Sequence, residues 1–344
     1  MVEHAACAGS VLTEADLRQA QEAYRLGEVR AVRYLADGLM NRNWRLRTDR
    51  GEFVLKCIVD VTPSLARRNL SVVSELGARG VPVCPAVRTA EGDLLAQIGG
   101  HSYALFPWVN GAHIRGVDLT AEQARALGGE LGRVHVELAG MVPAVLPYAP
   151  ETMTVSVPRA EQAVVEADRF LALASDDSSA FAGHVAEFLE QRKVLLGKYA
   201  GQRPASDVPA GRYGWAHGDF QHLNVLWLDG AVRAVLDWDR IRVRPLGEEV
   251  VRSATLLFGR EEGDLDLGLL SSFVRGYRSV VEVGGGELAD AVHRLWWKRM
   301  CDYWHLEFHY DRGDHSCDHL FLSASRFLDW WTGHLDEVQQ AFAA

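Results

Sequence analysis

The chain has 344 residues, of which 48% are hydrophobic and 24% are charged, and its formal net charge is −10. This length suggests about two domains, and no stretch approaches the roughly 18 consecutive apolar residues of a membrane span. This negative net charge argues against a nucleic acid or an anionic membrane as the partner. It is compatible with a cationic small molecule as the partner, and the alternative is that the charge only keeps the protein soluble.

The N-terminus and the cysteines indicate the compartment. Residues 1–12 lack the basic segment and the apolar core of a secretory signal. Five cysteines are scattered along the chain without a CxxC pair, which suits a reducing environment. We therefore expect a cytoplasmic protein.

The first hundred or so residues predict a sheet with few helices. A helix over residues 13–26 has Thr13 as its N-cap and Asp16 at its third position. After it the pattern alternates as strands do, with turn residues between the runs. Strands are predicted over residues 29–34, 43–48, 52–59, 83–89 and 101–108, which gives a five-stranded sheet.

Lysine is rare in this chain: only four of the 36 basic residues are lysines, and Lys56 is the first of them. It lies in the apolar run Phe-Val-Leu-Lys-Cys-Ile at residues 53–58, where a lone ammonium group needs a partner. A phosphate would supply one, since lysine offers a compact point charge. The alternative is a strand-edge lysine whose head reaches water.

Two segments near this strand also suit a phosphate. The turn at residues 36–43 carries Asn41 and Asn43 and would offer backbone N–H groups to phosphate oxygens. A helix over residues 63–77 places Asn69 as the odd polar residue on its apolar, inward face.

Residues 106–111, Phe-Pro-Trp-Val-Asn-Gly, predict a hinge because proline and glycine punctuate them. We expect an N-terminal lobe over residues 1–107 and a C-terminal lobe over residues 108–344. Beyond the hinge the hydrophobic pattern becomes helical. Helices are predicted over residues 120–138, 159–174, 180–200, 247–258, 264–280, 287–309 and 318–342.

The most informative motif is His-Gly-Asp-Phe-Gln-His-Leu-Asn at residues 217–224, followed by Leu-Asp-Trp-Asp at residues 236–239. Asn224 comes five positions after Asp219, and Asp237 comes thirteen after Asn224. The kinase catalytic loop has this layout of a proton-accepting Asp, a metal-binding Asn and a metal-binding Asp. The alternative is a hairpin with Asp and Asn as turn residues. The pattern predicts phosphoryl transfer.

The residue types suit that chemistry. A phosphoryl donor carries dense negative charge that a divalent cation neutralises, and Mg²⁺ prefers oxygen ligands. Asn224 would give a neutral oxygen and Asp237 a charged one. Asp219 would stay free of metal, orient the acceptor hydroxyl and take its proton.

Together these residues resemble the aminoglycoside phosphotransferase and choline kinase-like superfamily, the small-molecule relatives of protein kinases, over about residues 28–260. The segment Gly-Leu-Met-Asn-Arg-Asn-Trp at residues 38–44 is most similar to the homoserine kinase-like branch. The resemblance implies an α+β, bilobal, protein-kinase-like fold. Its N-terminal lobe would hold a five-stranded antiparallel sheet with a helix, and its larger C-terminal lobe would be mostly helical.

The resemblance also implies a nucleotide site, with ATP or GTP as the phosphoryl donor. Lys56 would contact the α- and β-phosphates. The turn with Asn41 and Asn43 would lie over the phosphates, and main-chain groups around Phe106 and Trp108 would bind the purine.

In the same way the resemblance gives roles to the catalytic motif. Asp219 would be the catalytic base, and Asn224 and Asp237 would hold Mg²⁺. His217 would brace the catalytic loop, whereas Asp239 would either assist at the metal or brace the loop.

The chain departs from the superfamily pattern at two positions. A helix glutamate usually pairs with the strand lysine, but Asn69 takes the inward position here and Glu75 falls off that face. Either Asn69 is a neutral partner of Lys56 in the nucleotide site, or the helical register differs. Gln221 replaces a lysine typical of protein kinases, which points away from protein substrates.

The acceptor site of the superfamily lies between the catalytic loop and the C-terminal helices. Residues 296–310 interleave aromatic and acidic side chains there, which would suit a sugar or a cationic ring. The candidate acceptor contacts are Asp302, Trp304 and Glu307, and helix packing is the alternative for each aromatic residue.

A group of possible metal ligands follows this region. The spacing of these residues matches no zinc pattern, so we expect a solvated loop between helices. The group comprises His309, His315, Cys317 and His319.

Three functions stay open. The first is an O-phosphotransferase that inactivates an antibiotic, favoured by the acidic, aromatic C-terminal region. The second is a metabolic kinase for homoserine, choline or a sugar, favoured by the asparagine-bearing turn. The third is a catalytically silent nucleotide-binding protein, against which Asp219, Asn224 and Asp237 argue. We expect a small hydroxylated acceptor and neither nucleic acid nor membrane as a partner; the oligomeric state is open.

Overall fold

The computed structural model describes residues 12–35, 41–141, 143–150 and 152–343. The chain forms two compact units, and their segments interleave along the sequence. The first unit comprises Met1–Ile114, Arg133–Tyr148 and Ala216–Arg242; the second comprises Arg115–Gly132, Ala149–Trp215 and Val243–Ala344. The motif at residues 217–224 thus belongs to the same unit as Lys56. The predicted division into consecutive lobes at residue 107 stays a prediction.

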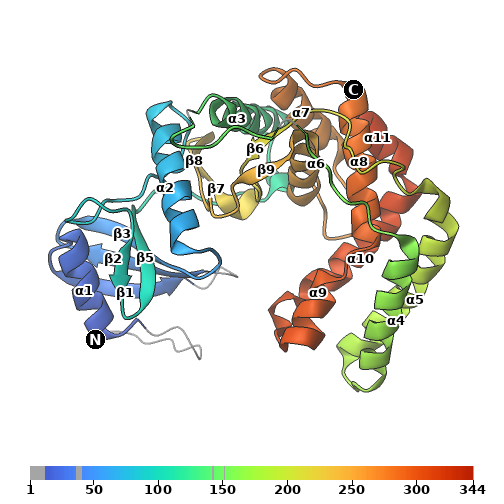
Figure 1. Cartoon of the computed structure of the whole chain (residues 1–344), viewed down its shortest axis with the longest axis horizontal. Helices are drawn as coiled ribbons and strands as arrows, with labels where there is room; N and C mark the ends of the chain where they lie inside the picture. Colours follow the sequence, from blue (N-terminus) through green and yellow to red (C-terminus); the bar gives the residue numbers. More distant parts are fainter. Residues whose placement is uncertain (1–11, 36–40, 142, 151, 344) are drawn as a thin grey trace. The chain divides into compact units, whose positions relative to one another are not determined.

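The first unit is built around a five-stranded sheet with the order β1-β2-β3-β5-β4, in which every neighbouring pair is antiparallel (Figure 1). The predicted five-stranded antiparallel sheet is confirmed. Its strands are β1 (Val29–Leu35), β2 (Arg42–Thr48), β3 (Gly51–Ile58), β4 (Ala96–Ile98) and β5 (His101–Pro107).

One of the five predicted strands is wrong. Residues 83–89 form only isolated bridges, from Val83 to Val235 and from Val87 to Leu105. Pro82 and Pro85 have no N–H to donate, so this segment cannot extend a ladder. The remaining strand of the sheet is instead the short β4.

Helix α1 (Glu14–Tyr24) covers one face of the sheet. It begins as predicted with a capping box, because the Thr13 hydroxyl accepts from the Asp16 N–H and the Asp16 carboxylate accepts from the Thr13 N–H. Below it lies a hydrophobic core that includes Ala20, Tyr24, Trp44, Leu46, Leu55, Cys57, Tyr103 and Leu105.

Helix α2 (Pro63–Ala78) covers the opposite face. Thr62 caps its start and Pro63 takes its first position, as the sequence predicts. Its Ala66 and Leu70 pack in a second core with Ile58 and Ala104. Because side chains alternate along a strand, Lys56 shares the face of Ile58 and points toward the α2 side.

A hairpin of β7 (Val225–Leu228) and β8 (Ala231–Val235) completes the first unit. Its turn at residues 229–230 has φ angles of 51° and 79°, as short hairpin turns require. The first residue of β7 pairs with the last residue of β8. The hairpin therefore brings Asn224, just before β7, close to the segment that carries Asp237.

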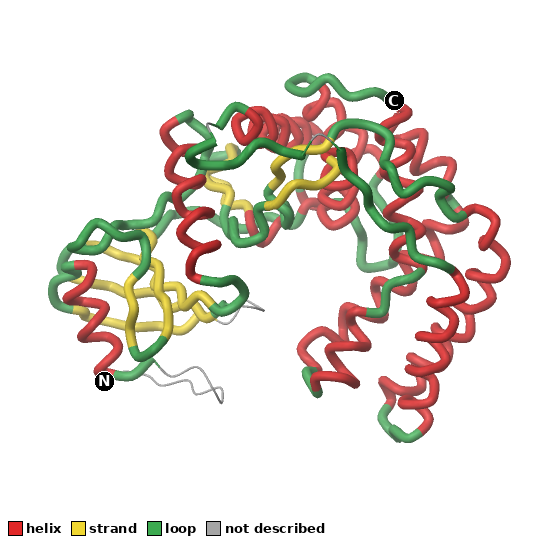
Figure 2. Tube along the Cα trace, in the orientation of Figure 1, coloured by secondary structure: helices red, strands yellow, loops and turns green. Residues whose placement is uncertain are grey.

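The second unit is helical, as Figure 2 shows. Its core holds three fully buried indoles, those of Trp296, Trp297 and Trp331. No helix in the described part of the chain is long and apolar enough to cross a membrane. The helices wholly within this unit are α4 (Ala160–Ser175), α5 (Ala180–Tyr199), α6 (Leu246–Leu257), α7 (Leu267–Arg278), α8 (Gly285–Met300), α9 (Trp304–Leu306), α10 (Asp318–Gly333) and α11 (Leu335–Ala343).

Three further elements cross the division between the units along the chain. Helix α3 (Ala121–Ala139) begins in the second unit and ends in the first. The strands β6 (Tyr213–Ala216) and β9 (Arg242–Pro245) pair in a two-stranded sheet on either side of the 216–242 segment.

Two long helices predicted near the C-terminus are wrong as single helices. The one predicted over residues 287–309 stops at Met300, and a new helix starts where the Asp302 carboxylate accepts the Trp304 N–H at 3.1 Å. The one predicted over residues 318–342 is interrupted after Gly333. Asp side chains favour helix starts and glycine is a weak helix former, and the hydrophobic period does not report either effect.

Candidate phosphotransfer site

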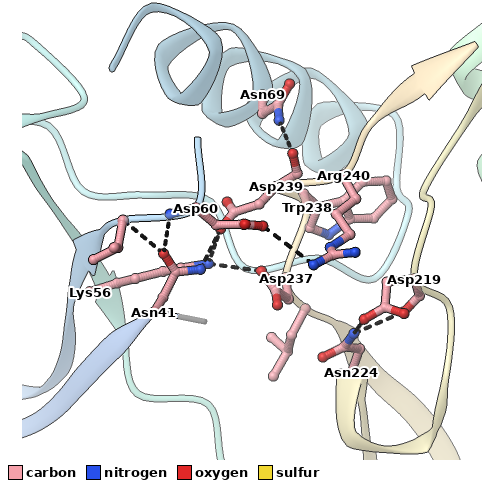
Figure 3. A network of polar contacts seen from close by, with 12 residues as sticks. Asn41, Lys56, Asp60, Asn69, Asp219, Asn224, Asp237, Trp238, Asp239 and Arg240 are labelled. Atoms are coloured by element: carbon pink, nitrogen blue, oxygen red, sulfur yellow. Dashed lines mark hydrogen bonds and ion pairs between the residues drawn. The ribbon is translucent and has the colours of Figure 1, made fainter. Parts of the chain in front are cut away.

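The ammonium group of Lys56 lies at the centre of the site (Figure 3). Strand β3 holds it opposite Asn43 of β2 and Ala104 of β5. Its Nζ lies 2.8 Å from Asp237 Oδ1 and 2.8 Å from Asp239 Oδ2. Burial opposes its charge, but the two carboxylates outweigh burial and raise the pKa of Lys56. The described partners of this ammonium group are thus carboxylates, and the phosphate partner suggested by the sequence stays a prediction.

The two carboxylates come from the segment that follows β8. Asp237 has a left-handed backbone with a φ of 56°, which is unusual for a residue other than glycine. The intervening Trp238 is buried, and its indole N–H donates to the Val235 carbonyl at 2.9 Å. Anchoring Trp238 in this way leaves the carboxylates on either side of it free to reach Lys56.

The two carboxylates differ in exposure. The side chain of Asp239 is 11% exposed, whereas that of Asp237 is 43% exposed. Burial raises the pKa of Asp237, but the Lys56 ammonium, helped by Arg240, outweighs burial, so this pKa is lowered overall. Asp237 is therefore an ionised carboxylate with an open side.

Two predicted asparagines hold Asp239 in place (Figure 3). Asn41 Nδ2 donates to Asp239 Oδ2 at 2.8 Å, and Asn41 Oδ1 accepts from the Val59 N–H at 3.0 Å. Asn69 Nδ2 donates to the Asp239 carbonyl at 2.9 Å. Asn69 is 2% exposed, so its predicted inward position on α2 is correct. Its Oδ1 accepts from the Arg68 guanidinium, so the described contacts of Asn69 are with Arg68 and the Asp239 main chain. The described partners of Lys56 are the two carboxylates.

The catalytic loop is held by His217, which is fully buried. Its Nδ1 accepts from the Asp219 N–H at 3.1 Å, and its Nε2 lies 2.9 Å from the Leu236 carbonyl. Because Nδ1 accepts, Nε2 must carry the proton that it shares with Leu236. This neutral imidazole ties the loop to the segment with Asp237, which agrees with the bracing role that the resemblance implies.

Asn224 and Asp219 contact each other directly. Asn224 Nδ2 donates to the Asp219 carbonyl at 2.8 Å and to Asp219 Oδ2 at 3.2 Å. The amide nitrogen is thereby used within the loop. The amide oxygen of Asn224 is left for another partner.

The donor set suits a hard divalent cation. Asn224 offers a neutral amide oxygen, and Asp237 offers a half-exposed carboxylate of which only Oδ1 contacts Lys56. Oxygen ligands of this kind are the ones that Mg²⁺ prefers. Both residues fit the metal that the sequence predicts for them.

The predicted hinge residues lie at the end of β5. The Trp108 N–H donates to the Glu52 carbonyl at 2.9 Å, and the Arg45 guanidinium lies 3.8 Å above the Trp108 ring. Phe106 packs partly buried against the core beneath α2. Contacts of Phe106, Trp108 and Asn43 with a purine or phosphates stay predictions. Of the predicted phosphate turn, residues 36–40 lie outside the described residues.

The three candidate acceptor contacts lie in the second unit, and only two of them come together. Asp302 and Trp304 line a pocket with Arg192, Arg299 and His305. Glu307 is exposed and begins a π-helical turn, and it is absent from this pocket's lining among the described residues. The role of all three in acceptor binding stays a prediction.

Sequence reasoning missed the direct ion pair of Asp239 with Lys56. It also missed Arg240, which lies 3.6 Å from Asp60 beside the same cluster. The Asp-Trp-Asp run could have indicated this ion pair. When the large apolar residue in the middle is buried, the two flanking carboxylates can face a common partner.

The sequence as a whole matches known phosphotransferases. Residues 31–282 match the model of the phosphotransferase enzyme family. Homoserine kinase from Burkholderia ambifaria (strain MC40-6) is 26% identical over 314 residues, covering 86% of this chain and 87% of the relative. Homoserine kinase from Burkholderia cenocepacia (strain HI2424) is 27% identical over 326 residues with the same coverage of both chains.

Solved structures share the fold. A spectinomycin phosphotransferase in complex with ADP and spectinomycin has a TM-score of 0.65 at 15% identity, covering 97% of this chain and 99% of that chain. An amicoumacin kinase in complex with AMP-PNP and Ca²⁺ has a TM-score of 0.62 at 17% identity, covering 96% and 94%. The predicted protein-kinase-like fold class is confirmed by this likeness. With the family match over residues 31–282, the chain belongs to the phosphotransferase enzyme family.

Proposed function

We propose that this phosphotransferase moves the γ-phosphoryl group of ATP or GTP to a hydroxyl group of a small molecule, with Asp219 as the catalytic base. The observation that carries the proposal is that two pairs of contacting polar side chains lie in one compact unit. Asn224 contacts Asp219, and Asp237 contacts Lys56. These are the groups that transfer of a phosphoryl group requires.

In the proposed reaction, Asp219 orients the acceptor hydroxyl and receives its proton. The acceptor oxygen bonds to the γ-phosphorus as the bond between that phosphorus and the bridging oxygen breaks, and the nucleoside diphosphate leaves. Lys56 holds the α- and β-phosphates by its charge. Asn224 and Asp237 would hold Mg²⁺, which would neutralise phosphate charge.

In this scheme Lys56 must exchange a partner when the nucleotide binds. Asp237 is the partner to be released, because its side chain is the more exposed of the two carboxylates. Asp239 stays with Lys56, since Asn41 and Asn69 also hold it. This division of roles keeps the lysine oriented without the helix glutamate of the superfamily.

For the acceptor we favour a small alcohol that carries a carboxylate and an amine, with homoserine as the first compound to test. Two homoserine kinases match this chain over 86% of its length. The pocket of the second unit offers both charges, with the Arg192 and Arg299 guanidiniums and the Asp302 side chain in its lining. Paired charges of this kind suit a zwitterion.

An antibiotic is the second candidate acceptor. The observation that favours it is the stacked pair of Trp304 and His305, whose ring centroids are 3.8 Å apart in the same pocket lining. Flat aromatic surfaces of this kind suit a sugar or a ring system. Antibiotic resistance would then be the biological role.

A panel of acceptors tests these alternatives. Release of nucleoside diphosphate from ATP and from GTP would be measured with homoserine, choline, a simple sugar, spectinomycin and an aminoglycoside. Turnover with homoserine alone supports the first candidate, and turnover with an antibiotic alone supports the second. No release with any hydroxylated acceptor would contradict the proposed reaction and favour a silent nucleotide-binding protein.

The proposed base is tested by Asp219→Asn. We expect turnover to fall by about 10²–10⁴-fold while nucleotide binding stays within a factor of about two. Asp229→Asn, in the hairpin turn of the same unit, is the matched control. A wild-type rate in Asp219→Asn would show that another group takes the proton.

A further inference from the structure

Outside the phosphotransfer site, three side chains of the second unit direct ligand atoms at one point. His309 Nδ1 lies 2.9 Å from both carboxylate oxygens of Asp318 and 3.0 Å from His315 Nδ1. His315 Nδ1 lies 3.5 Å from Asp318 Oδ2. All three ligand atoms therefore lie within 4.8 Å of one another.

One ordinary hydrogen bond at His309 Nδ1 satisfies only one of its two close contacts, the one with Asp318 or the one with His315. An imidazole Nδ1 carries at most one hydrogen. If His309 donates its hydrogen to Asp318, it cannot accept one from His315. If it accepts from His315, it presents a bare lone pair to the Asp318 carboxylate. A cation at the common point would accept a lone pair from each of the three atoms.

The local backbone explains why the sequence did not reveal this cluster. His309 comes from a π-helical turn, Glu307–Asp311, and His315 and Asp318 come from the 3-10 turn before α10 and the start of that helix. Single π-helical turns are rare and occur frequently at functional sites. The turn changes the spacing that an α-helix would give, so the linear pattern matches no familiar zinc motif.

A carboxylate lies near the second nitrogen of the buried histidine. The Nε2 atom of His309 lies 3.8 Å from Asp177 Oδ2, and the Phe181 ring stacks on the imidazole at 4.4 Å between centroids. Metal-binding histidines commonly donate their second N–H to a carboxylate, and here the carboxylate lies just beyond hydrogen-bond distance. His309 is 9% exposed, whereas the His315 side chain is 66% exposed, which gives an ion access from solvent.

We propose that His309, His315 and Asp318 bind a divalent cation of the Zn²⁺ class, with Asp177 orienting His309. Two imidazoles and one carboxylate are the ligands of three-residue Zn²⁺ sites, whose fourth position is open to water. Mg²⁺ prefers oxygen ligands, so the cation of the phosphotransfer site does not compete for these residues. The bound ion would tie the segment between α9 and α10 to the α4–α5 connection.

Zn²⁺ titration of the full chain tests the site. The protein is prepared without a histidine tag, treated with a chelator, dialysed and titrated by calorimetry in Mg²⁺-containing buffer. We expect one Zn²⁺ per chain, bound at least about ten-fold more weakly by His315→Ala than by wild type. Because His315 is exposed, this variant should fold. His319→Ala removes an exposed histidine outside the cluster and should bind Zn²⁺ as wild type does.

A second measurement tests the orienting residue and the structural effect. Asp177→Asn should weaken Zn²⁺ binding by about 10–100-fold. Zn²⁺ should raise the Tm of wild type and of His319→Ala, but not that of His315→Ala. The proposal is overturned if the wild-type chain binds no stoichiometric Zn²⁺, or if His315→Ala binds it as tightly as wild type.

Discussion

Two sites of this phosphotransferase, one in each unit, differ in whether their cationic side chains form ion pairs with described residues. In the first unit, the Lys56 ammonium has two carboxylate oxygens at 2.8 Å. In the second, Arg192 and Arg299 line one pocket, and neither forms an ion pair with a residue that the structure describes. Burial lowers the pKa of both arginines. The comparison teaches that the first site is organised before any ligand arrives, whereas the second would gain from binding an anion.

The largest loss of stability is expected when Lys56 loses Asp239, the more buried of its two carboxylate partners. Asp239→Ala should lower the free energy of unfolding by about 3–5 kcal/mol, because it leaves Lys56 and Asn41 short of an acceptor. Asp237→Ala should cost only about 1 kcal/mol, since that side chain is more exposed and solvent screens its charge. Urea unfolding of both variants measures the difference. Equal losses would contradict the distinct roles assigned to the two carboxylates.

Acid should weaken the second unit through its buried His305. Burial, Arg299, Arg192 and His319 lower the pKa of His305 to about 3, below the ordinary value of 6.5. Between these values the unfolded chain binds the proton and the folded chain does not, so falling pH favours unfolding. The loss should reach about 2 kcal/mol at pH 5.

The Asp237 carboxylate of the first unit gives no matching loss in this pH window. The lowered pKa of Asp237 makes its contribution present above the unfolded pKa of 3.8, and it is lost only as pH falls through the folded value. Urea unfolding between pH 8 and pH 5 measures the slope. His305→Phe should flatten it. An unchanged slope in His305→Phe would place the titrating group elsewhere.

A smaller effect is expected at the hydrogen bond that α2 makes to the Asp239 main chain. Asn69→Ala should lower the free energy of unfolding by about 1 kcal/mol, because the Asp239 carbonyl loses its donor. Since Asp239 holds Lys56, the KM for the nucleotide should rise in the same variant. Ser74→Ala, on the same helix, is the control for effects of helix propensity. A normal nucleotide KM in Asn69→Ala would mean that α2 does not position Lys56 through Asp239.

The smallest change in stability is expected at the uncompensated arginine. Arg299→Met should alter the free energy of unfolding by less than about 1 kcal/mol, in either direction, because no ion pair with a described residue is broken. If the pocket binds the acceptor carboxylate, the KM for homoserine should rise while the KM for ATP stays constant. A loss of several kcal/mol would show that Arg299 is compensated after all.

Much of the first unit was predictable from sequence because its features are local. The period-two pattern predicts the sheet, and Thr13 and Thr62 predict the helix starts. The spacing of Asp219, Asn224 and Asp237 selects the segments that the structure brings together, and their catalytic roles stay a prediction. What escaped prediction depends on contacts between distant segments. The ion pair of Asp239 with Lys56 joins residues that are 183 positions apart in the sequence. No local pattern encodes such a contact.

The second unit was less predictable because the helical spacing of its hydrophobic residues continues across positions where the helices end. Aromatic residues continue at helical spacing across residues 301–303, although the chain turns there at Asp302. The π-helical turn has the same origin, since one extra residue per turn leaves the composition unchanged. Helix existence was therefore predictable, and helix continuity was not.

At residue 237, stability and catalysis favour different amino acids. The left-handed backbone favours glycine, whereas the proposed chemistry requires the aspartate. Glycine adopts a φ of 56° without strain, so Asp237→Gly would relax the main chain but would also remove the proposed cation ligand. A selection for thermal robustness alone would drift toward glycine at this position, and a selection for turnover would restore the acid. Engineering a hardier enzyme from this chain should therefore leave residue 237 untouched and seek its gains in loops remote from the nucleotide.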